Sequence, residues 1–175
     1  MRRTVTLAAA VVLFGATVLS AQLPNFSGTW NRDTTGMGAM MAGGGGGGGG
    51  GGRGGRGGFT PGPMTLAQDA AKLTITRSQG GNDVMTVYNL DGSDSKNTPP
   101  GRGGNPGIEQ ISNAKWAGAT LSIVTKRTLQ DSSTAVTTAV YSLDASGKVL
   151  TVATTQPPRG GGDSITNSVK YNKAP

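Results

Sequence analysis

The chain contains no cysteine and no histidine among its 175 residues. Without cysteine it can form no disulfide bond, so its stability must come from apolar burial and backbone pairing. Without either residue it lacks the usual zinc ligands, a thiol nucleophile and every histidine-based catalytic triad. These absences exclude most common enzyme mechanisms, and the sequence predicts a protein that is not an enzyme and carries no cofactor.

Carboxylates are also scarce, because the chain has 9 Asp and Glu against 16 Lys and Arg. Asp91, Asp94 and Glu109 are the candidates for an acid and base pair or for a hard-cation site. However, Asp91-Gly92 is typical of a turn, Asp94 lies in a polar stretch, and Glu109 is the only glutamate. We therefore predict neither carboxylate catalysis nor a metal site.

Only one long apolar run is present, and it lies at the N-terminus. It begins at Val5 after two arginines and ends in small residues, which is the pattern of a secretory signal peptide. The run is about 15 residues long, shorter than the roughly 20 that span a bilayer as a helix. We expect residues 1–21 to be a signal peptide cleaved near Ser20 or Ala21. The mature chain should then be periplasmic or secreted, with no membrane span.

Aromatic residues make up only 5% of the chain, and no stretch of the mature sequence shows a sustained helical period. Short alternating runs are separated by turn residues instead, and threonine is frequent, as is typical of half-exposed sheet surface. The sequence predicts strands at 26–32, 64–68, 72–78, 84–90, 109–116, 120–129, 134–143, 148–155 and 164–172. Most separators are short enough for antiparallel hairpins, so the predicted fold class is all-β, an up-and-down meander.

The second and third of these predicted strands differ in register. Met64 and Leu66 lie on even positions. Leu73 and Ile75 lie on odd ones, so one straight strand cannot bury both pairs. Either residues 68–72 form a tight turn, which gives nine strands, or a bulge there gives eight. A helix-free meander of this size best removes its edges by closing into an eight- to ten-stranded barrel.

Glycine is the residue type in excess, with 31 in the chain. Ten are consecutive at 43–52, within a segment at 33–63 that has almost nothing to bury. We expect this segment to be a disordered insertion in a single barrel domain spanning 22–175. Two Arg-Gly-Gly units follow the ten glycines, and two more contain Arg102 and Arg159. Such units bind RNA in cytoplasmic proteins, but export and the near absence of adjacent aromatic residues argue against nucleic-acid binding.

In an up-and-down meander, successive connections alternate between the two ends of the barrel. The long connections at 98–107 and 157–163, which contain Arg102 and Arg159, then lie at the same end. The glycine-rich insertion joins them there if 68–72 is a bulge, and it lies at the opposite end if 68–72 is a hairpin. We expect the end with the long cationic loops to be the mouth of any cavity.

The stretch FSGTW at 26–30 lies near the mature N-terminus and opens a strand. It resembles the Gly-x-Trp element of the lipocalins and their bacterial lipocalin-like relatives, and the later hairpin patterns resemble those of small exported bacterial β-barrels. The resemblance implies a barrel whose base is closed by Trp30, with Gly28 as the other residue of the motif. Lipocalins commonly place an arginine of the last strand over this tryptophan, and here that strand offers Lys170 and Lys173.

Tyr88, Trp116 and Tyr141 lie within predicted strands and would supply polar groups to a cavity if they face inward. Together with Arg102 and Arg159 they form the predicted ligand-binding set. The preferred hypothesis is an exported, non-enzymatic, lipocalin-like barrel that binds a small apolar molecule. The alternative is a structural or interaction protein of the cell envelope whose filled barrel displays its loops. An enzyme, the third class considered, would require an enclosed pair of carboxylates.

Overall fold

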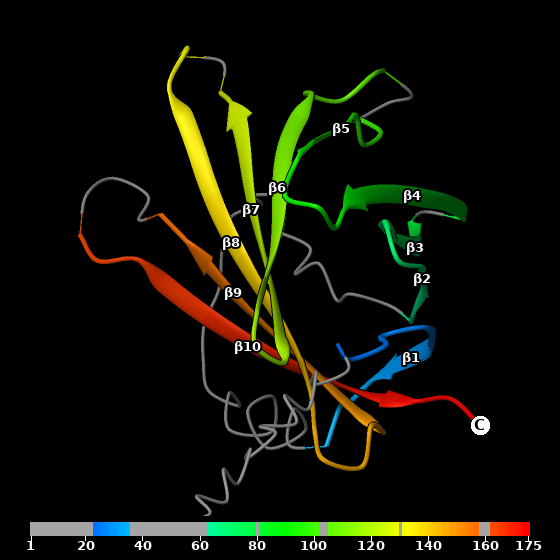
Figure 1. Cartoon of the computed structure of the whole chain (residues 1–175). Coiled ribbons are helices and arrows are strands. Elements are labelled where there is room, and N and C mark those ends of the chain that lie inside the picture. The colour runs from blue at the N-terminus through cyan, green and yellow to red at the C-terminus, as the bar shows by residue number, and fades with distance from the viewer. Residues whose placement is uncertain (1–22, 36–62, 80, 102–104, 130, 158–161) are drawn as a thin grey trace, which may run out of the picture.

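The computed structural model describes residues 23–35, 63–79, 81–101, 105–129, 131–157 and 162–175. Within these ranges the chain forms ten β-strands (Figure 1). They are β1 (Gly28–Arg32), β2 (Met64–Gln68), β3 (Lys72–Gln79), β4 (Asn82–Asn89), β5 (Asp94–Asn97), β6 (Gln110–Ala117), β7 (Thr120–Thr128), β8 (Thr134–Leu143), β9 (Val149–Gln156) and β10 (Ile165–Lys173). No helix in the described ranges is long and apolar enough to cross a membrane. The predicted signal peptide at 1–21 and most of the predicted insertion at 33–63 lie outside the described residues.

The ten strands form one antiparallel sheet in the order β4-β3-β2-β1-β10-β9-β8-β7-β6-β5. Consecutive strands pair with each other, except that β4 and β5 do not pair and form the two edges of the sheet. In addition, β1 pairs with β10, which brings the first and last strands together. The sheet curls into a nearly closed barrel (Figure 1). The predicted all-β meander and barrel are therefore confirmed.

Nine of the ten strands agree with the predicted ranges to within two residues. The segment between β2 and β3 is a tight hairpin, because the Asp69 N–H donates to the Lys72 carbonyl and the Asp69 carboxylate accepts the Ala71 and Lys72 N–H groups. The hairpin alternative therefore holds. The sequence does not predict β5, whose DSKN stretch has no apolar alternation, so the expected number of nine strands is too low by one.

The additional strand changes the end at which the insertion begins. With a hairpin at 69–71, the sequence predicts that the insertion and the connections at 98–107 and 157–163 lie at opposite ends, and this prediction is wrong. Because β5 adds one more reversal, the β1–β2 connection leaves β1 toward the same end as those two connections. We call this end the mouth, and we call the end that carries the turns at 69–71 and 118–119 the base.

Side chains, and not a backbone ladder, close the seam between β4 and β5. The Asn97 amide accepts the Val87 N–H at 2.9 Å and donates to the Val87 carbonyl at 2.9 Å. The Asn89 N–H donates to the Ser95 hydroxyl at 2.7 Å, and the Asn89 side-chain amide donates to the Asp94 carbonyl at 3.1 Å. These bonds satisfy strand-edge groups that would otherwise be open to pairing with another chain.

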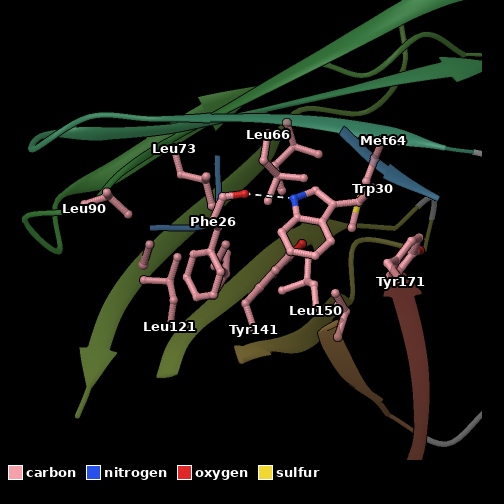
Figure 2. Packing of buried hydrophobic residues seen from close by; sticks show 14 residues of the cluster. Phe26, Trp30, Met64, Leu66, Leu73, Leu90, Leu121, Tyr141, Leu150 and Tyr171 are labelled. Carbon is pink, nitrogen blue, oxygen red and sulfur yellow. Dashed lines mark hydrogen bonds between the residues drawn. The ribbon is translucent and has the colours of Figure 1, made fainter. Parts of the chain in front are cut away.

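The segment before β1 folds into the base of the barrel and seals it (Figure 2). Phe26 is fully buried, and its ring stacks on Trp116 with the ring centroids 5.6 Å apart. The indole Nε1 of Trp30, which is also fully buried, donates to the Phe26 carbonyl at 2.9 Å. Gln68 anchors the segment, since its Oε1 accepts the Phe26 N–H and its Nε2 donates to the Pro24 carbonyl. Trp30 is thus a core residue at the base, as the resemblance implies.

Gly28 and Trp30 of the predicted motif accommodate a lysine from the last strand. Trp30 and Lys173 are cross-strand partners, and the Lys173 Nζ lies 5.5 Å from the centre of the Trp30 ring. Gly28 has a φ of 139°, and a Cβ at this position would lie 2.8 Å from the Lys173 Cε. Any other residue would be strained there and would displace the lysine. The cation over the tryptophan therefore comes from Lys173.

Candidate functional site

The interior of the barrel changes from apolar at the base to polar toward the mouth. Alternate residues along each strand face inward. On β3 the buried Ile75 is followed on the inner face by Arg77, and on β9 the buried Val152 is followed by Thr154. The apolar core therefore stops short of the mouth, and polar side chains line the remaining interior.

A cavity of about 540 Å³ opens in this polar part, bounded by β1, β3, β9 and β10. Arg32 and Arg77 line it together with side chains of β9 and β10 that include Val152, Gln156 and Asn167. β1 is short and pairs with β10 only from Tyr171 onward, so among the described residues no strand pairs with this edge of the earlier part of β10. The volume falls within the roughly 300–1,000 Å³ of sites that hold small molecules.

Two arginines with buried, unpaired nitrogens are the most unusual feature of this cavity. The Nε atoms of Arg32 and Arg77 are buried and have no hydrogen-bond partner. An Arg77 Nη2 contact to the Met64 sulfur at 3.5 Å provides only a weak acceptor. All nine Asp and Glu residues of the chain lie in the described ranges, and none of them forms an ion pair with either arginine. A buried N–H group without an acceptor is costly, so this arrangement requires an explanation.

Tyr88 and Tyr141 lie near Arg77 inside the barrel. Burial raises the pKa of Tyr88 above its ordinary value of 10.0, and the neighbouring Tyr141 adds to this effect while Arg77 opposes it. Burial likewise raises the pKa of Tyr141, against the charge and hydrogen bonding of Arg77. Both phenols therefore stay protonated at neutral pH. They can donate hydrogen bonds, but they provide no negative charge to balance the guanidinium.

A second, smaller cavity of about 190 Å³ lies on the side of Arg77 that faces β4. Tyr88 from β4 and Gln110 from β6 line it, together with Arg77. Arg77 lines both cavities, so its side chain lies where the two meet. Arg77 is therefore available to a ligand in either cavity.

The structure places three of the five predicted ligand-binding residues, in two locations. Tyr88 lines the smaller cavity. Trp116 and Tyr141 belong to the packing at the base, and the exposed fraction of Tyr141 is only 3%. Arg102 and Arg159 lie outside the described residues. The structure thus brings Tyr88 and Tyr141 close to one charged group and leaves Trp116 among apolar neighbours.

Arg32 and Arg77 are not among the residues predicted to bind a ligand, although the sequence contains a signal for them. Arg32 continues the even positions of the buried Trp30, and Arg77 continues the odd positions of Leu73 and Ile75. Each is therefore a charged residue at an inward position of an otherwise apolar strand face. An arginine at such an inward-facing position indicates that this part of the barrel interior is polar.

The carboxylates serve mainly to close turns. Asp91 accepts hydrogen bonds from the Ser93 N–H and hydroxyl, and Asp131 does the same with Ser133. The hydroxyl bonds, followed by the backbone bonds, lower the pKa of both carboxyls below 3.8. In the part of the chain that the structure describes, no three Asp or Glu residues gather in a way that could hold a metal ion. Turn geometry accounts for these residues.

Fold and cavity together define a class of protein, a small, nearly closed antiparallel β-barrel with an apolar base and an arginine-lined cavity toward its mouth. Comparison of the sequence with protein-family models and with curated proteins finds no match. The function must therefore be argued from the barrel interior itself.

Proposed function

We propose that this chain is an exported, non-enzymatic, lipocalin-like β-barrel protein that binds a small molecule in the cavity toward its mouth. The observation that carries the proposal is the cavity of about 540 Å³, which is open to solvent on one side and is lined by side chains of four strands above a packed base. A concave site of this size with a few polar groups is typical of small-molecule binding. The N-terminal signal-peptide pattern supports export.

The lining supports a ligand of mixed character, whereas the sequence predicts an apolar one. Val152 and Val169 offer apolar contacts, while Thr154 and Asn167 offer hydrogen-bonding groups on the same wall. A purely apolar ligand would leave these polar groups and the two arginines without partners, at a cost in binding free energy. We therefore propose a ligand that has both an apolar and a polar part.

A structural or interaction protein of the cell envelope that binds no small molecule is the second candidate. The observation that favours it is the base, where Phe26, Trp30 and Leu150 are fully buried and leave no room for a ligand. In this case the barrel would serve as a rigid support for its loops.

A neutral apolar dye, N-phenyl-1-naphthylamine, whose fluorescence increases in non-polar surroundings, separates the two candidates. Thr154 faces the cavity, so Thr154→Trp should fill it, whereas Thr151→Trp adds the same side chain to the outer face of β9. We expect one dye to bind per chain in the wild type and in Thr151→Trp, and the affinity to fall at least about tenfold in Thr154→Trp. Thermal unfolding checks that both variants fold.

Equal dye affinity in all three proteins would show that the dye binds elsewhere. If the wild type takes up neither this dye nor an amphipathic probe such as octanoate, the proposed function is contradicted and the filled structural barrel is favoured. A selective loss in Thr154→Trp would support binding within the cavity.

A further inference from the structure

The cavity contains positive charge that the protein itself does not balance. Arg32 and Arg77 both line it, and no carboxylate of the chain forms an ion pair with either. Long side chains often extend their charged ends toward water, which would account for exposed Nη groups. That explanation does not extend to the two buried Nε atoms, which have no hydrogen-bond partner.

We propose that the ligand carries a carboxylate group, and that Arg77 and Arg32 bind this carboxylate inside the cavity. The inference rests on the proposed function, because it names the chemical class of ligand for the same cavity. A carboxylate matches the planar fork of a guanidinium and can accept hydrogen bonds from its Nη groups. It would therefore supply the negative charge that no carboxylate of the chain supplies to the two arginines.

The surroundings of Arg77 favour an anionic ligand over a neutral one. The neighbouring phenols of Tyr88 and Tyr141 are neutral, so they do not balance the charge of Arg77, and only Tyr88 lines a cavity beside it. The opposite wall of the cavity offers Val152 and Val169 to an apolar part of the ligand. The lining thus fits a small amphipathic carboxylic acid, with its charged end at the arginines.

Octanoate and 1-octanol, which share the chain length and differ in the charged group, test this assignment by isothermal titration calorimetry. We expect the wild type to bind octanoate at least about tenfold more tightly than octanol. Arg77→Met keeps an unbranched side chain as far as the position of Nε and removes the charged end of the guanidinium. It should lower the affinity for octanoate by about 10- to 100-fold and leave that for octanol nearly unchanged.

Arg127→Met is the matched control, because Arg127 is exposed, comes from β7 and lines a different cavity. It removes the same charge from the same end of the barrel, so a general electrostatic effect would appear in both variants. We expect the octanoate affinity of Arg127→Met to stay within about twofold of the wild type. Arg32→Met, at the end of β1, is the second test variant and should also weaken octanoate binding selectively.

The outcomes separate the two proposals. Octanol binding as tight as octanoate binding, with both lost in Thr154→Trp, would overturn the carboxylate assignment and leave the binding function intact. Equal loss of octanoate affinity in Arg77→Met and Arg127→Met would also overturn the assignment. If neither ligand binds and the neutral dye is not taken up, both proposals fail together.

Discussion

Replacement of Phe26 by alanine tests whether the segment before β1 is the stopper of the barrel base. The side chain is fully buried, its ring stacks on Trp116 at 5.6 Å and it meets Tyr141 at 6.2 Å. Truncation of a buried phenylalanine costs about 3–5 kcal/mol, including the cavity that remains. Because two aromatic contacts are lost as well, we expect a loss of about 4 kcal/mol in the free energy of unfolding.

Urea unfolding followed by tryptophan fluorescence measures this loss directly, since both tryptophans contact Phe26. A loss of about 4 kcal/mol corresponds to a decrease of roughly 10 °C in Tm for a domain of this size. Trp116 loses its stacking partner, so the emission of the folded variant should shift to longer wavelength. Phe26→Leu keeps most of the volume and should lose only about 1.5 kcal/mol.

Leu23→Ala is the control for the same segment, because the Leu23 side chain is 50% exposed. It should change the free energy of unfolding by no more than about 0.5 kcal/mol. A loss below about 1 kcal/mol in Phe26→Ala, with unchanged tryptophan emission, would refute the view that this segment closes the base.

Three further predictions concern the seam, the cavity and the turns. Asn97→Ala removes both side-chain bonds to Val87 and should lower the free energy of unfolding by about 1–3 kcal/mol, with faster hydrogen exchange at the Val87 amide; unchanged exchange would contradict the seam. Arg77→Met removes a poorly paired charge from the interior, so it should raise Tm by about 2–4 °C in thermal scans while it weakens carboxylate binding; a lower Tm would assign the residue a structural role. The Asp69 pKa lies below 3.8 because the Ala71 N–H and then the Lys72 N–H donate to the carboxylate. The stability that the ionised Asp69 carboxylate contributes is fully present above the unfolded-state pKa of 3.8 and is lost as the pH falls through the lowered pKa of the folded state. The difference in urea midpoint between the wild type and Asp69→Ala should therefore shrink from about pH 5 to pH 2.

The sequence predicts the strands well where apolar alternation and turn chemistry coincide, as in β7 and β8. It does not predict β5, because four polar residues acquire their strand conformation from pairing with β6 and from the bonds of Ser95 and Asn97 to β4. Local propensity carries no information about such partners. The missing strand also reversed the expected location of the insertion, since each additional strand changes the end at which the chain turns.

The candidate site was predictable only in part. Tyr88 is an aromatic residue in an alternating strand, and it does line a cavity. Trp116 has the same signal but packs against Phe26, because the segment before β1 occupies the space that a ligand would need. Arg32 and Arg77 line one cavity because β1, β2 and β3 are successive antiparallel strands in a register that aligns Trp30 with Met64 and Met64 with Arg77, and this register cannot be predicted from either local sequence.

Native mass spectrometry of the mature protein, purified from its natural source, shows whether the barrel carries a ligand. We expect the chain to retain one small molecule per protein, and organic extraction to release a compound with a carboxylate group. A mass that corresponds to the bare chain, together with no uptake of octanoate or of the neutral dye, would indicate a barrel that binds no ligand.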